Sequence, residues 1–171
     1  MIPQGVFLFL FLENLGVSFV DIKYRKISNQ WSILNIVIFI GLLIFSPDNY
    51  SLSFDHFIIP LSFFFVGFLL FIFDVMGGGD AKFFSTCFLL MPYTEQLELL
   101  VILCASTIVM GLTIMIYNIF KGINIVLQGI QTKDIKLILS CFGSRFAYAP
   151  VLLISLIVYG FKVDLFGFGK I

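Results

Sequence analysis

Two aspartates, Asp21 and Asp80, stand beside long apolar segments, where a carboxylate is costly and usually functional. Two carboxylates that lie close together cannot both ionise readily, so they share one proton. The ionised one can draw a proton from a water molecule that attacks a peptide carbonyl. The protonated one can polarise the carbonyl oxygen and later protonate the leaving amine. If the helices that carry them pack together, the pair could therefore hydrolyse a peptide bond as an aspartic dyad, for which we expect neither a cofactor nor a metal.

Three consecutive glycines, Gly77, Gly78 and Gly79, directly precede Asp80. Glycine loses more backbone freedom on folding than any other residue, so a run of three between apolar segments indicates a special requirement. Glycines here would let an extended substrate backbone lie close to Asp80. A structural interpretation stays open for both aspartates, because Asp80 is placed to cap the helix that follows it and Asp21 to cap a loop.

The composition places these aspartates in a membrane protein. Hydrophobic residues make up 60% of the chain, charged residues only 12%, the net charge is zero and the mean hydropathy is +1.11. The apolar residues form long blocks with polar breaks, which predicts a polytopic all-α membrane protein. Zero net charge argues against nucleic acid as a partner. We expect one transmembrane domain over residues 1–171 with six helices, at about 3–20, 31–45, 57–73, 81–91, 97–120 and 146–161.

The positive charges predict the orientation of these helices. With the N-terminus outside, the basic residues of the loops and the glycine break all lie in the cytoplasm, and only Lys162 and Lys170 of the C-terminal tail lie outside. Asp21 and Asp80 then share the cytoplasmic side. The cytoplasmic set is Lys23, Arg25, Lys26, Lys82, Lys121, Lys133, Lys136 and Arg145, and the opposite loops hold Asp48, Asp55, Glu95 and Glu98.

The fourth helix is short, about 18 Å against about 30 Å of hydrocarbon, so Asp80 is expected below the cytoplasmic surface. The glycines would then be non-helical backbone inside the membrane, which is tolerated only within protein or beside a water-filled cavity.

Other polar residues lie outside the aspartate pair. Glu13 shares a rough helix face with Asp21 and either bonds to a neighbouring helix or helps to set the protonation of the dyad. We expect Asp74 to be structural and His56 to be a surface residue of an outer loop. Lys82 holds Asp80 ionised, meets substrate or extends to the interface. The isolated cysteines predict small buried hydrophobes rather than a zinc site; they are Cys87, Cys104 and Cys141.

Three segments together carry a family resemblance. Residues 77–80 match the motif GxGD, and Gly79 to Lys82 extend it as GDxK. Residues 21–29 match D-x-x-x-R-x-I-P-N at Asp21, Arg25, Ile27 and Asn29, with Ser28 in place of the proline. Residues 145–150 resemble a P-x-A-P-type segment that opens the last helix, without its first proline. The chain thus resembles, over nearly its whole length, the type IV prepilin peptidases, membrane aspartic peptidases that include the archaeal preflagellin peptidases.

The resemblance implies function and site residues. It makes Asp21 and Asp80 catalytic and places Gly77, Gly78, Gly79, Lys82, Arg25 and Asn29 in the motifs near substrate. The substrate would be a pilin-like precursor with a short basic leader in the cytoplasm and an apolar helix in the bilayer, cut just before that helix. GxGD is shared with presenilin-like proteases, but those carry a tyrosine before the first aspartate, where this chain has Val20.

Larger members of that family add a zinc-binding domain with paired cysteines and methylate the new N-terminus. This chain resembles the short, peptidase-only kind that serves Tad/Flp pili, so we expect no methyltransferase activity. The cellular location implied is the cytoplasmic (inner) membrane of a prokaryote, with both termini outside.

Two other functions stay open. One is a small proton- or ion-coupled transporter that uses Glu13, Asp21 and Asp80 as a relay. Transporters often have broken helices at matching positions of two repeated halves, whereas only one glycine break is present here. The other is a catalytically inactive assembly protein of a pilus or secretion system.

Overall fold

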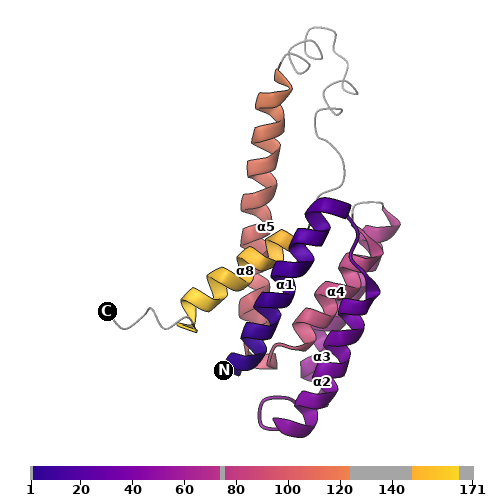
Figure 1. Ribbon diagram of the computed structural model, residues 1–171, viewed down its shortest axis with the longest axis vertical. Helices are drawn as coiled ribbons and strands as arrows, with labels where there is room; N and C mark the ends of the chain where they lie inside the picture. Colours follow the sequence, from indigo (N-terminus) through magenta and orange to yellow (C-terminus); the bar gives the residue numbers. More distant parts are fainter. Residues whose placement is uncertain (1, 74–75, 124–147, 166–171) are drawn as a thin grey trace.

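The computed structural model describes residues 2–73, 76–123 and 148–165, and the regular structure within them is entirely helical (Figure 1). This confirms the predicted all-α class. Three of the helices, α1, α3 and α5, are long and apolar enough to cross a membrane, whereas α2 and α8 are apolar but shorter. The helices are α1 (Gln4–Tyr24), α2 (Asn29–Phe45), α3 (Phe54–Ile72), α4 (Gly78–Leu89), α5 (Tyr93–Lys121) and α8 (Ala149–Lys162).

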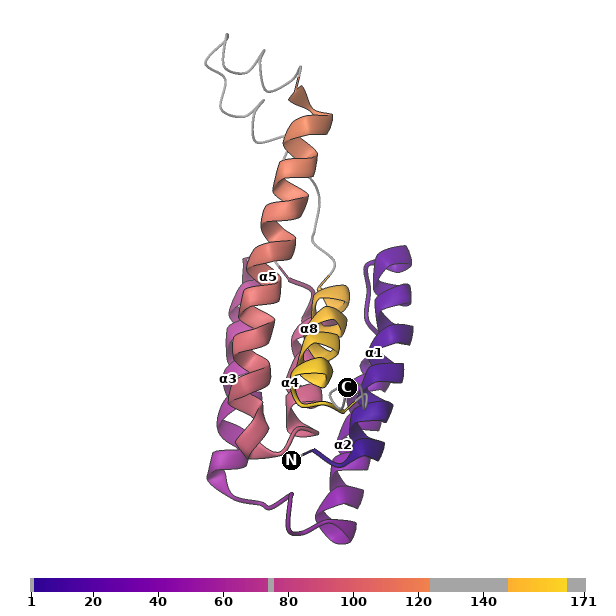
Figure 2. The same cartoon turned by 90° about the vertical axis from the view of Figure 1, so that its left-hand side faces the viewer.

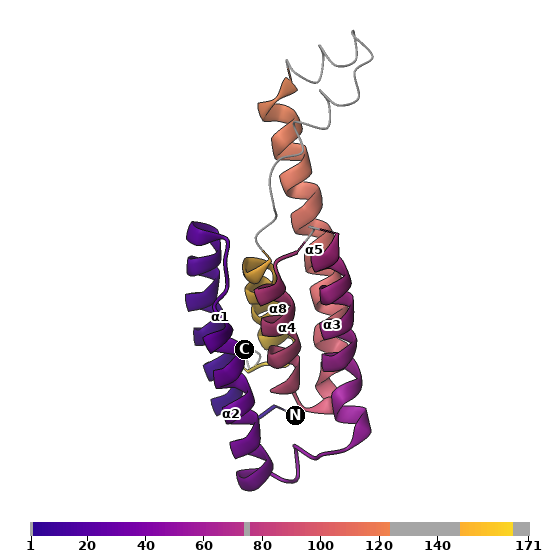
Figure 3. The same ribbon diagram turned by 90° about the vertical axis from the view of Figure 1, so that its right-hand side faces the viewer.

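The short helix α4 lies inside the bundle. It packs against α2 and α3, while α8 packs against α1 and α5. Figures 2 and 3 show α1 and α2 on one side, α3 and α5 on the other, and α4 and α8 between them. The end of α1 and the starts of α4 and α8 therefore meet at one end of the bundle.

Small residues bring α3 and α4 unusually close. A Cβ atom on Gly67 would lie 2.6 Å from the Cβ of Ala81, so only glycine fits at this crossing. Beside it, the Phe63 ring of α3 stacks on two rings of α4, with centroids 6.1 Å from Phe84 and 4.7 Å from Phe88. This packing fixes where α4, and hence Asp80, sits against α3.

Buried polar side chains satisfy the carbonyl end of α4, which would otherwise leave acceptors unpaired. The Tyr50 hydroxyl donates to the Leu90 carbonyl at 2.9 Å, and His56 Nε2 lies 2.9 Å from the Leu89 carbonyl. Gln96 Nε2 lies within 3.0–3.1 Å of three carbonyl oxygens of the same region. Burial raises the pKa of Tyr50, so its hydroxyl remains a donor. The expectation of a surface His56 is wrong, because this ring is fully buried at the start of α3.

Two helix boundaries differ from the predictions in ways that matter for the site. Helix α1 continues to Tyr24, so Asp21 is helical rather than part of a polar loop. Helix α4 begins at Gly78, so Gly78 and Gly79 form its first turn, and the prediction of a non-helical glycine run is wrong for these two. Only Gly77, with φ −72° and ψ 142°, has the extended backbone of a residue that precedes a helix.

Candidate active site

Asp21 lies in the last turn of α1 and caps a different helix. Its side chain is buried, and its Oδ2 accepts a hydrogen bond of 3.0 Å from the backbone N–H of Ala149, the first residue of α8. The first N–H groups of a helix have no partner within it and carry partial positive charge, so this position favours a carboxylate. Arg25, with φ 50°, ends α1 by donating its backbone N–H to the Asp21 carbonyl at 2.8 Å.

Asp80 occupies the third position of α4 and folds back over the tip of its own helix. Its Oδ2 accepts a hydrogen bond of 3.2 Å from the backbone N–H of Gly77, and the residue is 8% exposed. Because glycine has no side chain, only this half of a capping box is formed. Asp80 therefore does cap its helix, as the structural interpretation expected, and the same bond holds its carboxylate at the tip of α4.

The two carboxylates are electrostatic neighbours. The charge of Asp21 acts on Asp80, and that of Asp80 acts on Tyr148, the residue before Ala149. Burial and the Asp80 charge raise the pKa of the Tyr148 hydroxyl, which therefore stays protonated at neutral pH. The structure thus brings Asp21 and Asp80 to one end of the bundle, with the start of α8 beside both.

The same region matches a known family model. Residues 6–116, which include both aspartates, match the model of the type IV leader peptidase family. The chain belongs to the type IV leader peptidase family. Membership indicates a peptidase, and together with the apolar helices it indicates a membrane protein. No curated protein and no solved structure gave a match.

The structure distinguishes the three glycines of this leader peptidase family member. A Cβ on Gly77 would lie 3.1 Å from Asp80 Oδ2, and one on Gly79 would lie 2.5 Å from the Ile27 carbonyl oxygen. A Cβ on Gly78 would make only ordinary contact, 3.5 Å from the Phe71 ring. None of the three has a positive φ, so close approach rather than backbone conformation demands glycine at Gly79, whereas a Cβ on Gly77 would require the Asp80 carboxylate to shift by a few tenths of an ångström.

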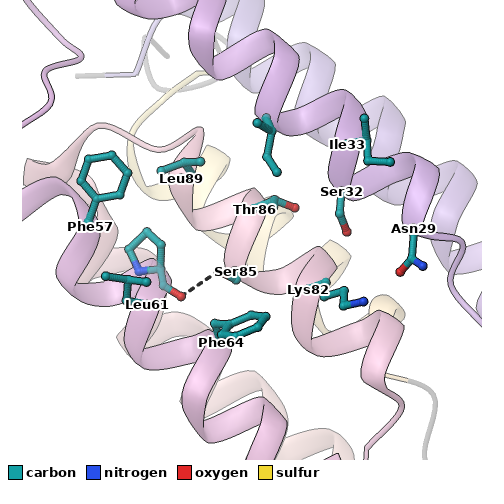
Figure 4. A pocket seen from close by; sticks show the side chains of 12 residues that line it. Asn29, Ser32, Ile33, Phe57, Leu61, Phe64, Lys82, Ser85, Thr86 and Leu89 are labelled. Carbon is teal, nitrogen blue, oxygen red and sulfur yellow. Dashed lines mark hydrogen bonds between the residues drawn. The ribbon is translucent and has the colours of Figure 1, made fainter.

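The other motif residues lie around the pair rather than within it. Arg25 is exposed, and its charge acts on Asp21. Lys82 and Asn29 line a groove on the side of α4 away from Asp80 (Figure 4). Ser28 accepts a 3.3 Å hydrogen bond from the Gln30 N–H as the N-cap of α2, which explains why serine can replace proline here. Asp74 and Arg145 lie outside the described residues.

A buried polar cluster links α1 to α2 below Asp21. Glu13 is 5% exposed, and the Asn35 amide, with its nitrogen toward Glu13, donates to both carboxylate oxygens at 3.0 and 3.1 Å. We assign this orientation of the Asn35 amide because the opposite one would point the amide oxygen at the two carboxylate oxygens of Glu13, which are also acceptors. Glu13 therefore makes the interhelical bond expected of it. Spacing along the sequence gave no signal for Asn35, because its partner lies on another helix.

Proposed function

We propose that the chain is a membrane-embedded aspartic endopeptidase that removes the short basic leader from pilin-like precursors on the cytoplasmic side of the membrane. The observation that carries the proposal is the convergence of Asp21 and Asp80, two buried carboxylates from different helices that are each fixed by a backbone N–H at a helix N-terminus. Precursors of pilus or secretion machinery are the substrates that fit the family.

The arrangement suits a shared-proton mechanism. Backbone N–H bonds fix the direction of each carboxylate, so both are pre-positioned without moving parts. The ionised aspartate takes a proton from water as the water oxygen bonds to the scissile carbonyl carbon. The neutral aspartate gives its proton to the carbonyl oxygen, forming a tetrahedral diol. The C–N bond then breaks, the amine nitrogen takes the proton held by the first aspartate, and a diol hydroxyl returns its proton to the second.

Helix lengths support a site recessed in the membrane. Helices α4 and α5 are joined by a short turn at Leu90–Pro92 and have 12 and 29 residues. At 1.5 Å per residue, α4 rises about 18 Å from this turn and α5 about 43 Å. A hydrocarbon layer of about 30 Å that begins at the turn would place the tip of α4 roughly 12 Å below the opposite surface. Figure 1 shows α5 extending beyond the rest of the bundle.

The distribution of charged residues between the two ends of the bundle supports six membrane-crossing helices with the N-terminus outside. The end with the aspartates carries Lys23, Arg25, Lys26, Lys82 and Lys121 among the described residues. The other end carries acidic residues, and its Lys162 pairs with Glu98 at 2.7 Å. By the positive-inside rule, the aspartates face the cytoplasm, where a precursor's basic leader would be.

The experiment that tests the proposal uses purified protein in detergent or liposomes with a precursor that has a basic leader and an apolar helix. We expect a shortened product whose mass places the cut just before the apolar helix. A precursor with its leader basic residues replaced by serine serves as the control and should be cut more slowly. The proposal fails if the protein leaves such precursors intact. Proton movement across the same liposomes would then support the transporter alternative.

A further inference from the structure

A groove of about 610 Å³ runs along the outer side of α4, between α2 and α3. Figure 4 shows Ile33 of α2 and Leu61 and Phe64 of α3 as its walls, with Lys82 and Leu89 of α4 along its floor. Most of its lining is apolar, as expected for a surface that faces lipid or an apolar segment.

One end of this groove is polar and lies next to the candidate active site. Lys82 and Asn29 stand there, and Lys82 is two residues from Asp80. Within the apolar part, the Ser85 hydroxyl donates to the Pro60 carbonyl at 2.7 Å and that of Thr86 to the Phe83 carbonyl at 2.9 Å. The Ser32 hydroxyl is buried and has no partner within the described part of the chain (Figure 4). A buried hydroxyl without a partner is costly, so an occupant with polar groups would stabilise it.

We propose that this groove receives the first turns of the precursor's apolar helix, with the bond to be cut crossing the tip of α4 to reach Asp80. This inference rests on the proposed function. The first N–H groups of a helix, and the carbonyls of the residues before it, lack partners within the helix. Ser32 can accept from such an N–H, and Lys82 and Asn29 can donate to such carbonyls. A lipid chain would fill the apolar part but leave the Ser32 hydroxyl unpaired.

The tip of α4 is built to let a peptide cross it. The Asp80 carboxylate points back toward Gly77, at the very start of the helix. Lys82 and Leu89 lie on the opposite helix face, which forms the groove. Of the glycines at the tip, Gly78 lies beside the Phe71 ring and Gly79 beside the Ile27 carbonyl, so the substrate backbone would reach the carboxylate over Gly77, which places no side chain in front of it.

Disulfide crosslinking to a trapped precursor tests this path. The Asp80→Asn variant, with Cys104 and Cys141 replaced by serine, would hold uncut precursor. Ile33→Cys should crosslink to a cysteine early in the precursor's helix, and Ile36→Cys to one about three residues further on, because both helices advance about 1.5 Å per residue. Val101→Cys, on the lipid-facing side of α5, is the matched control: Val101 is 62% exposed and Ile33 59%.

A second measurement separates this inference from the proposed function. Ile36→Trp fills the groove without touching either aspartate and should slow cleavage by about tenfold or more, whereas Val101→Trp should not. If wild type cuts the precursor but Ile33→Cys and Val101→Cys crosslink equally, or Ile36→Trp cuts normally, the groove assignment is wrong and the peptidase stands. If wild type cuts nothing, the proposed function itself fails.

Discussion

The backbone of Gly79 lies against the carbonyl group of Ile27 so closely that a Cβ atom on Gly79 would be 2.5 Å from the Ile27 oxygen. Ile27 is buried in the link between α1 and α2, and Gly79 lies in the first turn of α4. The contact therefore holds the helix that carries Asp80 against the segment that directly follows the helix of Asp21. It connects two of the sequence motifs in space.

Alanine at Gly79 should break this contact, whereas alanine at Gly78 should not. The methyl group of Gly79→Ala must push α4 away from Ile27, and a shift of about 1 Å at a catalytic group can cost about 10²-fold in rate. Gly78→Ala should keep its activity and stabilise the helix by up to about 1 kcal/mol. Cleavage rates and thermal unfolding in detergent measure both effects. A Gly79→Ala variant as active as Gly78→Ala would contradict the close approach.

Gly67→Ala should destabilise the bundle through the crossing of α3 and α4. Its methyl group would lie 2.6 Å from the Cβ of Ala81, so the helices must separate, at a cost of about 1–3 kcal/mol. Gly111→Ala is the matched control, because nothing lies within 4 Å of a Cβ there. Thermal unfolding should show a lower midpoint for Gly67→Ala and an unchanged or higher midpoint for the control, because alanine favours a helix more than glycine does. Equal midpoints would mean that the two helices do not pack this closely.

Removing Asn35 should cost more than neutralising Glu13. Asn35→Leu leaves the buried Glu13 carboxylate without its donor, which costs about 1–3 kcal/mol or more. Glu13→Gln keeps a hydrogen-bonding partner for Asn35 and should retain substantial cleavage activity. A double-mutant cycle with Glu13→Leu tests the pairing, since the double variant should be more stable than the sum of the single losses predicts. Strict additivity would show that the two side chains do not interact.

The motifs could be recognised from the sequence, but their partners could not. The glycine run before Asp80 and the motif around Asp21 are local patterns, and the family match confirms the family that they indicate. The Asp21 bond to Ala149 joins residues far apart in the chain, so no spacing signals it. The sequence predicts an outer-loop position for His56, because the carbonyl that its ring contacts belongs to another helix and leaves no sign in the residues around it. Helix α4 began earlier than predicted because Asp80 caps it from inside its first turn.

Labelling of introduced cysteines should show the orientation. Ser28 and Asn49 are both exposed and lie at opposite ends of α2. In a background with Cys104 and Cys141 replaced by serine, an impermeant thiol reagent added to intact cells should label Asn49→Cys and leave Ser28→Cys unlabelled. Lysed cells, in which both must react, provide the control. The reverse pattern would place the aspartates on the side away from a precursor's leader.

Cleavage by the asparagine variants of Asp21 and Asp80 tests the central claim most directly. Asparagine keeps the size of aspartate and caps a helix N-terminus about as well, so both variants should stay folded, but neither can share the proton. Each should eliminate cleavage, and the double variant should be hardly worse than either, because the two residues act as one unit. Asp48→Asn, in an exposed turn, should cut normally. An Asp80→Asn protein that still removes the leader would contradict the account.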